Sequence, residues 1–241
     1  MSLFDEGQKV FWEKRTSNVR PHSHPIVRAF TKQRAELVAK WMEGSVFESA
    51  LDVGCGDGFG MCSLQELVPY IFGCDGSLGM LRGNPVARGA LCQANAYTLP
   101  FADASFDLVY CWELLHHVRE PVRVVKEMAR VSSRYVMIFE PNSLNLPMML
   151  YGIISPEERG LLRFTPWYLK QLLIQAGIRP LKTLTGGCFT PNYTPEWLFT
   201  ILKRMPYTWP LVGISNIVLA EVPFERKATT HETYNARRND G

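Results

Sequence analysis

The sequence lacks the patterns that hold a structural zinc ion or a disulfide framework. Its six cysteines include no Cys-x-x-Cys pair, and no histidines stand near them in a zinc-ligand spacing. Most of the cysteines stand in apolar stretches, as small buried thiols do. We therefore expect reduced, structural cysteines and no metal site, which suits a cytoplasmic protein.

Long apolar runs and dense basic runs are also lacking. No apolar stretch reaches the ~20 residues of a membrane-spanning helix, and the first fifteen residues carry acids and lysines where a signal peptide has an apolar core. The net charge is only +3, from 26 basic and 23 acidic residues, so we do not expect nucleic acid as a partner. The apolar residues 144–154 are consistent with a lid, a dimer contact or peripheral contact with a membrane or lipid, and the oligomeric state stays open.

What the sequence does contain is a regular alternation of strand and helix patterns. With 241 residues, 46% of them hydrophobic, the chain can form one large domain with a substantial core. Short apolar stretches predict strands at 50–53, 70–74, 90–93, 106–111, 135–139, 181–184 and 216–222. Helical spacing of apolar residues follows most of them. This alternation predicts an α/β fold, a doubly wound Rossmann-like sheet with helices on both faces.

The same pass along the chain predicts its division into parts. Apolar residues between Val27 and Trp41 fall on one helix face, so residues 1–45 are interpreted as a helical N-terminal cap. Residues 46–224 form the main domain, with insertions at about 142–164 and 189–213, and the polar residues 225–241 form a disordered tail. Thr165 before Pro166 predicts a helix start, and Gly177 predicts the end of that helix.

The most informative stretch is LDVGCGDGFG, residues 51–60, where four glycines follow an apolar strand. Glycine adopts positive φ and lets a ligand lie directly on the backbone, here at the carboxyl edge of a parallel sheet. A phosphate-binding P-loop is excluded because no Gly-Lys-Ser/Thr follows, and a dinucleotide fingerprint fails because Phe59 or Met61 stands where its last glycine belongs. A nicotinamide-dependent oxidoreductase is therefore the weakest of the functions considered.

The remaining pattern, Asp52-x-Gly54-x-Gly56-x-Gly58, resembles motif I of the class I S-adenosylmethionine-dependent methyltransferases. LPFADASFDLVYCWELLHHV, residues 99–118, resembles a run typical of their ubiquinone-biosynthesis-like subgroup, methyltransferase type 11. RFTPWYLKQLLIQAGI, residues 163–178, resembles the helix before that family's sixth strand. The resemblance covers residues 46–188 and the last strand, and it implies seven strands of which the last is antiparallel.

The resemblance implies S-adenosylmethionine as cofactor and a set of residues to bind it. Asp75 ends the second strand and would hold the ribose hydroxyls by charge-assisted hydrogen bonds, or would cap the next helix. Asp52 would either brace the glycine loop or face the methionine ammonium. Asn95 replaces the family's more usual Asp at the adenine edge. The implied cofactor-binding residues are Asp52, Gly54, Cys55, Gly56, Asp75, Gly76, Asn95, Ala96, Tyr97 and Cys111.

Three residues after the fourth strand are candidates for catalysis. His116 is the first candidate for a general base, followed by Glu113 and His117, because imidazole and carboxylate groups accept protons near neutral pH. The alternatives are that the histidines brace the loop by hydrogen bonds and that Glu113 is a surface or capping acid. A base is needed only where the acceptor must lose a proton.

The resemblance thus implies an enzyme that methylates a small-molecule acceptor: an aromatic or quinone-like compound, a lipid or a sugar-linked metabolite. The sequence CWEL stands where nucleic-acid amine methyltransferases carry an NPPY-type motif. A non-catalytic S-adenosylmethionine-binding sensor or partner subunit remains the alternative.

Overall fold

The computed structural model describes residues 3–17, 19–45 and 47–223; the predicted disordered tail lies outside the described residues. The strands are β1 (Ser49–Val53), β2 (Tyr70–Asp75), β3 (Leu91–Gln93), β4 (Phe106–Trp112), β5 (Ser132–Pro141), β6 (Arg179–Gly186) and β7 (Ser215–Glu221). The α-helices are α1 (Leu3–Glu13), α2 (Pro25–Trp41), α3 (Phe59–Leu64), α4 (Leu78–Gly83), α5 (Pro121–Val131), α6 (Leu146–Ile154), α7 (Pro166–Gln175) and α8 (Glu196–Leu202). Short 3-10 helices add η1 (Arg88–Ala90), η2 (Leu115–His117) and η3 (Pro156–Arg163).

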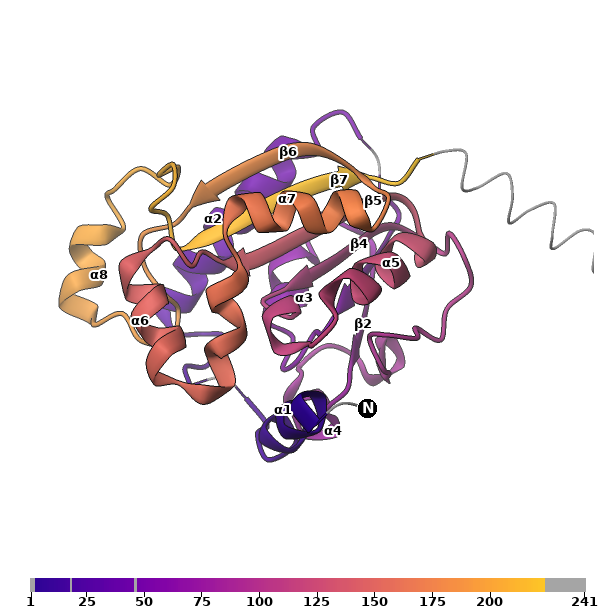
Figure 1. The fold of residues 1–241 in the computed structure, drawn as a ribbon, viewed down its shortest axis with the longest axis horizontal. Coiled ribbons are helices and arrows are strands. Elements are labelled where there is room, and N and C mark those ends of the chain that lie inside the picture. Colours follow the sequence, from indigo (N-terminus) through magenta and orange to yellow (C-terminus); the bar gives the residue numbers. More distant parts are fainter. Residues whose placement is uncertain (1–2, 18, 46, 224–241) are drawn as a thin grey trace, which may run out of the picture.

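The strands form one seven-stranded sheet in the order β3-β2-β1-β4-β5-β7-β6 (Figure 1). β1 to β5 pair in parallel, and β7 runs antiparallel to both β5 and β6. The predicted doubly wound fold with an antiparallel last strand is confirmed. The chain passes from β1 outward to β2 and β3, then returns to β4 on the other side, and such a switch opens a crevice at the carboxyl ends of β1 and β4.

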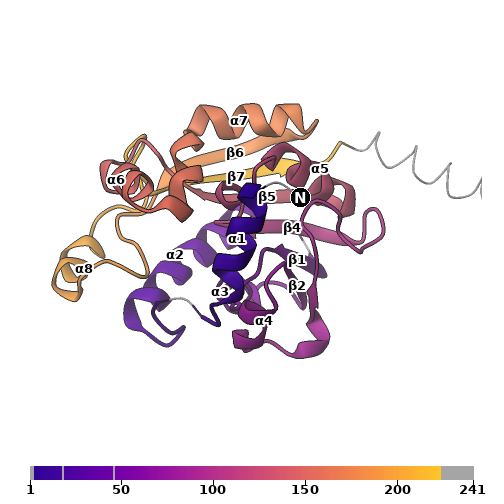
Figure 2. The same ribbon diagram turned by 60° about the horizontal axis from the view of Figure 1, so that its bottom comes forward.

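Helices cover both faces of the sheet because the buried strands are apolar on both sides. Side chains alternate along β4: Val109 and Cys111 face α5 and α7, whereas Leu108 and Tyr110 face α2 and α3. Figure 2 shows α5 and α7 on one side of the strands and α2 and α3 on the other. The side chains on each face thus form a buried cluster with the helices that cover it, and the packed sheet holds the loops at its edge in place.

The N-terminal segment contributes two helices with different positions. α2 begins at Pro25 after His24, whose Nδ1 accepts a hydrogen bond of 3.2 Å from the backbone N–H of Ile26. Phe30 and Val38 of α2 are buried against the sheet, whereas α1 lies beside α4 at the edge of the sheet (Figure 1). The assignment of residues 1–45 to a separate cap stays a prediction.

The two insertions are largely helical. Residues 142–164 contain α6 and η3, residues 189–213 contain α8, and both lie at the same end of the molecule (Figures 1 and 2). α7 begins as predicted, with Thr165 Oγ1 accepting a hydrogen bond of 3.1 Å from Tyr168, and Gly177 follows it at φ +73°. None of the helices in the described part of the chain is long and apolar enough to cross a membrane.

Candidate functional site

A cavity of about 1400 Å³ opens at the carboxyl ends of β1, β2 and β4. This volume exceeds the ~300–1,000 Å³ of a typical small-molecule pocket, so the cavity has room for two ligands side by side. Its lining includes these predicted residues: Asp52, Gly54, Cys55, Gly56, Asp75, Gly76, Asn95, Ala96, Tyr97, Glu113, His116 and His117. Residues from α1, α6, η3 and the second insertion complete the wall.

The predicted Cys111 is not brought into the cavity. Its side chain is fully buried in the core between the sheet and α5 and α7. Because side chains alternate along a strand, the next residue, Trp112, lines the cavity instead. The indole of Trp112 stacks on Phe139 with ring centroids 4.7 Å apart, which fixes this part of the wall.

The glycine loop after β1 lies tightly against the loop after β4. Gly54 and Gly56 have φ of +77° and +49°, backbone conformations that residues other than glycine rarely adopt. A Cβ atom on Gly54 would lie 2.8 Å from Cδ1 of Leu114, next to the predicted catalytic residue Glu113. The backbone conformation therefore favours glycine at both positions, and the close approach of the two loops is a second reason at Gly54.

Asp75 ties the glycine loop to the end of β2. Its Oδ2 accepts a hydrogen bond of 2.9 Å from the N–H of Gly56, and its Oδ1 accepts one of 2.7 Å from the N–H of Ser77. Burial raises the pKa of Asp75 despite these bonds. The N-cap of α4 is Ser77, whose Oγ accepts from the N–H of Met80 at 3.1 Å, so Asp75 does not have the capping role.

Asp52 is a buried acid whose carboxylate meets no hydrogen-bond donor in the described part of the chain. Its exposed fraction is 1%, and neither carboxylate oxygen accepts a hydrogen bond from the described residues. The Tyr110 hydroxyl lies beside it and acts to lower its pKa, although the two groups are outside hydrogen-bond distance or angle. Burial raises the pKa of Asp52 to about 8. Such a carboxylate is costly unless a positive or hydrogen-bonding group from a ligand meets it.

The loop after β3 is connected to α1. Asn95 Oδ1 accepts a hydrogen bond of 2.9 Å from the N–H of Tyr97, which shapes the turn. The hydroxyl of Tyr97 donates to Asp5 Oδ1 at 3.0 Å and accepts from the N–H of Glu120 at 3.2 Å. Tyr97 thus anchors α1 over the cavity, a role that sequence reasoning missed.

Glu113 occupies a strained backbone position at the end of β4. Its φ is +56°, and its N–H donates a hydrogen bond of 2.8 Å to the carbonyl of Phe139. Non-glycine residues are uncommon at positive φ, and such strain clusters at functional sites. Burial raises the pKa of Glu113, which favours its protonated form.

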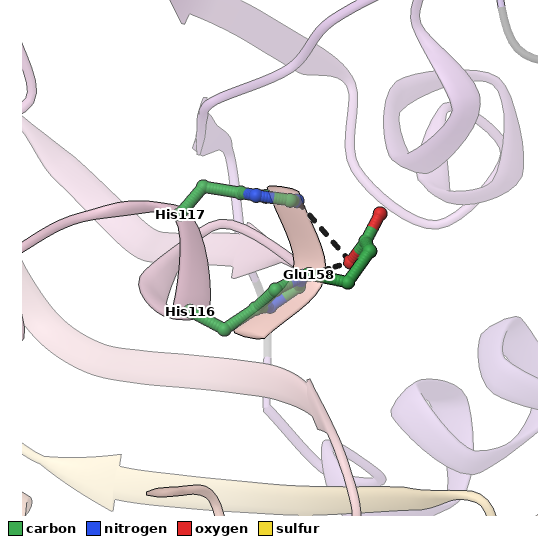
Figure 3. A group of neighbouring side chains, drawn as sticks. All are labelled: His116, His117 and Glu158. Carbon is green, nitrogen blue, oxygen red and sulfur yellow. Dashed lines mark hydrogen bonds and ion pairs between the residues drawn. The ribbon is translucent and has the colours of Figure 1, made fainter. Parts of the chain in front are cut away.

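The two predicted histidines meet two glutamates that the sequence analysis did not single out. His116 Nδ1 lies 2.7 Å from Oε2 of Glu140, and His116 Nε2 lies 3.2 Å from Oε2 of Glu158. His117 Nε2 lies 3.9 Å from that same oxygen of Glu158 (Figure 3). Glu140 is a lone acid in a buried strand, a signal that could have been noticed, whereas Glu158 lies in an insertion and carried no signal.

The charges of this cluster follow from its contacts. Burial lowers the pKa of His116, but the carboxylates of Glu140 and Glu158 outweigh it and raise that pKa to about 10. Burial and the neighbouring His116 lower the pKa of His117 to about 3. Burial raises the pKa of Glu158, but His116 and His117 outweigh it and lower that pKa to about 2. At neutral pH His117 is therefore the imidazole with a free lone pair, and the assignment of a general base stays a prediction.

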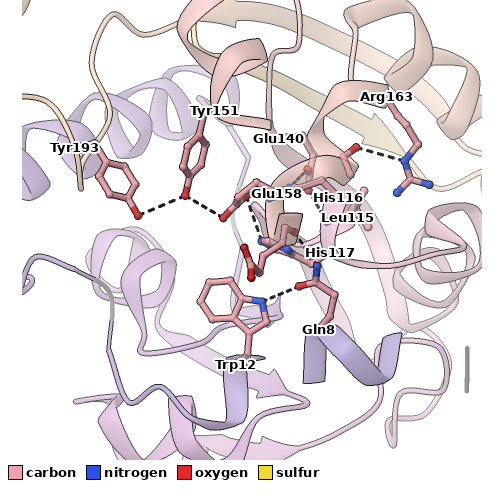
Figure 4. A network of polar contacts seen from close by, with 12 residues as sticks. Gln8, Trp12, Leu115, His116, His117, Glu140, Tyr151, Glu158, Arg163 and Tyr193 are labelled. Carbon is pink, nitrogen blue, oxygen red and sulfur yellow. Dashed lines mark hydrogen bonds and ion pairs between the residues drawn. The ribbon is translucent and has the colours of Figure 1, made fainter. Parts of the chain in front are cut away.

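A wider polar network connects three separate segments at this cluster (Figure 4). The hydroxyl of Tyr151 on α6 donates to Oε1 of Glu158 at 3.3 Å and lies 3.4 Å from the hydroxyl of Tyr193. On α1, Trp12 Nε1 donates to Gln8 Oε1 at 3.2 Å, and Gln8 Nε2 donates to the carbonyl of Glu157 at 2.7 Å. The N-terminal segment and both insertions therefore meet at the wall formed by the histidines.

Comparison with known proteins is consistent with this site. Residues 51–135, which contain the glycine loop and Asp75, match the family model described as a methyltransferase domain. Over 163 residues the chain is 28% identical to a ubiquinone biosynthesis O-methyltransferase of Hahella chejuensis, covering 64% of this chain and 65% of that protein. Over 192 residues it is 29% identical to the O-methyltransferase resE of Aspergillus sclerotiorum, covering 71% and 68%.

Among solved structures, a SAM-dependent methyltransferase from Thermotoga maritima superposes with a TM-score of 0.62 at 18% identity. The match covers 82% of this chain and 91% of that one, and it establishes the fold. The chain spans 65% of the Hahella relative and only 38% of a relative from Encephalitozoon cuniculi that is named as a methyltransferase. The resemblance stated from the sequence motifs is confirmed.

Proposed function

We propose that the chain, whose residues 51–135 match a methyltransferase domain, transfers a methyl group from S-adenosylmethionine to a small-molecule acceptor. The observation that carries the proposal is Asp52, a carboxylate buried without a hydrogen-bond partner among the described residues at the edge of the cavity. The methionine ammonium of the donor is a group of the charge and hydrogen-bonding capacity that this carboxylate lacks.

The remaining donor-binding residues fit the same ligand. The bare backbone of Gly54 and Gly56 offers a surface without Cβ atoms for the methionine and ribose. Each carboxylate oxygen of Asp75 already accepts one N–H, and each has a further lone pair for a ribose hydroxyl. Asn95, Ala96 and Tyr97 lie at the end of β3, where the adenine would be held.

S-adenosylmethionine supplies an already activated methyl group, which the acceptor's lone pair takes up while the carbon–sulfur bond breaks and its electron pair stays on sulfur. The chain's own residues supply alignment and exclusion of water, which can contribute much of the rate enhancement. Glu113 and His117 lie on the β4 side of the cavity, where they would orient the acceptor or take its proton.

We favour an acceptor with a hydroxyl group on an apolar or ring-shaped body. The cavity wall carries the aromatic residues Trp12, Tyr151 and Tyr193, which suit such a body. The relatives named as ubiquinone biosynthesis O-methyltransferase and O-methyltransferase resE support oxygen as the methylated atom. All six cysteines are free, which supports a cytoplasmic location.

Contact with a lipid surface belongs to the same proposal. α6 carries no charged residue, and four of its side chains, Leu146, Leu150, Ile153 and Ile154, are exposed. α8, beside the same cavity, exposes Trp197 and Ile201. An apolar acceptor could pass from a lipid phase into the cavity along these helices.

Calorimetric titration with S-adenosylmethionine, S-adenosylhomocysteine and NADH tests the donor. We expect binding of the first two ligands only, and a loss of at least ~1.4 kcal/mol, tenfold in affinity, for Asp75→Ala. Binding of NADH alone, or of none of the three, contradicts the proposal. Incubation with hydroxylated rings and lipids then separates an enzyme, which releases S-adenosylhomocysteine, from a sensor, which only binds the donor.

A further inference from the structure

We propose that His116, His117 and Glu158 bind a divalent transition-metal ion of the zinc class, with one coordination position open to the cavity. The three side chains come from η2 and η3 and converge on one point (Figure 3). Two imidazoles and one carboxylate are the protein ligands of a common type of catalytic zinc site.

The distances fit a tetrahedral ion. The three ligand atoms lie within 4.8 Å of one another, with His116 Nε2 at 3.2 Å and His117 Nε2 at 3.9 Å from Glu158 Oε2. Bonds of ~2.0–2.1 Å around a tetrahedral ion place its ligand atoms ~3.3 Å apart. The distance of 3.2 Å from His116 Nε2 matches this spacing, and the distance of 3.9 Å from His117 Nε2 exceeds it by about 0.6 Å.

A second carboxylate orients the first ligand. Glu140 is fully buried, and its Oε1 accepts a hydrogen bond of 2.6 Å from the N–H of Leu115. Its Oε2 lies 2.7 Å from His116 Nδ1, which fixes the ring with Nε2 directed toward Glu158, and a bound ion would take the place of the proton on Nε2. Carboxylate, histidine and metal in this order are the usual outer arrangement of a metal site.

The position of His117 distinguishes a metal ion from a shared proton. Nε2 of His116 and the carboxylate of Glu158 could be bridged by one proton alone. A shared proton does not involve His117, which also interacts with the backbone of Glu157, yet its ring centroid lies 3.9 Å from that of His116 and its Nε2 lies 3.9 Å from the same oxygen. Because imidazole nitrogen is preferred by zinc, copper, iron and nickel, the donor set disfavours magnesium and calcium.

The open position gives the ion a role that rests on the proposed function. All three ligands line the cavity, so the fourth position would take an oxygen atom of the acceptor. A bound divalent ion lowers the pKa of a hydroxyl group. An acceptor hydroxyl there would release its proton to water, leaving the oxygen lone pair free to form the bond to the methyl carbon.

The test is titration of the chelator-treated full-length chain with Zn²⁺ and with Co²⁺, by calorimetry and by visible absorption of Co²⁺. We expect one ion per chain and an absorption spectrum of four-coordinate Co²⁺ with nitrogen and oxygen ligands. His117→Gln and Glu158→Gln should each weaken binding at least ~tenfold. Glu157→Gln is the matched control, because the neighbouring acid also lines the cavity but is outside the cluster.

The outcome is read together with thermal unfolding and S-adenosylhomocysteine binding of the same samples. The proposal is overturned by the absence of saturable binding, by binding that survives both variants, or by the charge-transfer bands of thiolate ligands. If Glu158→Gln does not fold, His117→Gln decides. If the chain binds S-adenosylhomocysteine but no metal ion, only the metal site is refuted. If it binds the metal ion but not S-adenosylhomocysteine, only the proposed donor is refuted.

Discussion

The hydroxyl of Tyr97, at the end of the third strand, donates a hydrogen bond of 3.0 Å to Asp5 of α1 and so connects a helix to a loop 92 positions away. We predict that Tyr97→Phe loosens α1, because it removes this bond and the two that the hydroxyl accepts from the N–H groups of Arg119 and Glu120. The loss should be about 0.5–1.5 kcal/mol for each hydrogen bond. Limited proteolysis within residues 3–17 should become faster, and the affinity for S-adenosylhomocysteine should fall.

Tyr70→Phe is the control, because Tyr70 lies on β2 and is largely exposed. Equal proteolysis rates for the two variants would show that the Tyr97 hydroxyl does not hold α1.

We predict that the affinity for S-adenosylmethionine increases with pH up to about 8. The pKa of Asp52 is raised to about 8 by burial, so the carboxyl is protonated at pH 6 in the free protein. Only the ionised form attracts the ammonium, so affinity should increase by up to ~tenfold per pH unit below 8 and level off above it. Calorimetry at pH 6, 7 and 8 measures the slope, and Asp52→Asn should abolish it.

The same group predicts a pH-dependent change in stability. Since the folded pKa of Asp52 lies above its ordinary value of 3.8, its contribution to stability is complete at low pH and is lost as pH rises through about 8. Asp52→Asn should therefore raise the melting temperature at pH 9 more than at pH 4. A shift of equal size at both pH values would contradict the assignment.

We predict that Glu113→Gly is more stable than Glu113→Ala by ~1 kcal/mol. At φ +56° a Cβ atom is strained, and only glycine removes the strain. Chemical denaturation of both variants measures the difference. If the two variants unfold at the same denaturant concentration, the positive φ is not maintained in solution.

We predict that Ile154→Lys reduces co-sedimentation with lipid vesicles without loss of stability. Ile154 on α6 is 77% exposed, so lysine costs little in the folded chain but weakens contact with an apolar surface. Ile174→Lys on α7, at a position that is 59% exposed, is the matched control. An equal effect of both substitutions, or no binding by the unchanged chain, would contradict lipid contact through α6.

The donor half of the site could be predicted from the sequence because its signals are local. The glycine loop and Asp75 each follow a strand that its own apolar pattern reveals, and parallel strands bring their carboxyl ends to one edge. Cys111 was placed on the correct strand, but alternation turned its side chain into the core and brought Trp112 to the cavity. Because neighbouring residues of a strand face opposite sides of the sheet, an error of one position is enough to assign Cys111 to the cavity in place of Trp112.

The histidine wall could not be predicted in the same way. Glu158 meets His116 only because η3 folds back against η2, a contact between segments about forty residues apart that no local pattern specifies. The same holds for Gln8 of α1, which reaches the carbonyl of Glu157 across 149 positions. These contacts depend on how the insertions pack against the rest of the chain. The sequence predicted no metal site because it does not show that Glu158 lies beside the two histidines.

The division of the cavity wall has a consequence for how new specificity could arise in this chain. The part of the wall that would hold the donor is formed by the turns after β1, β2 and β3, whereas α6, η3 and the second insertion form another part. Substitutions and length changes in those three segments leave the sheet and its glycine loop untouched. The molecule can therefore exchange one acceptor for another while retaining the same source of methyl groups.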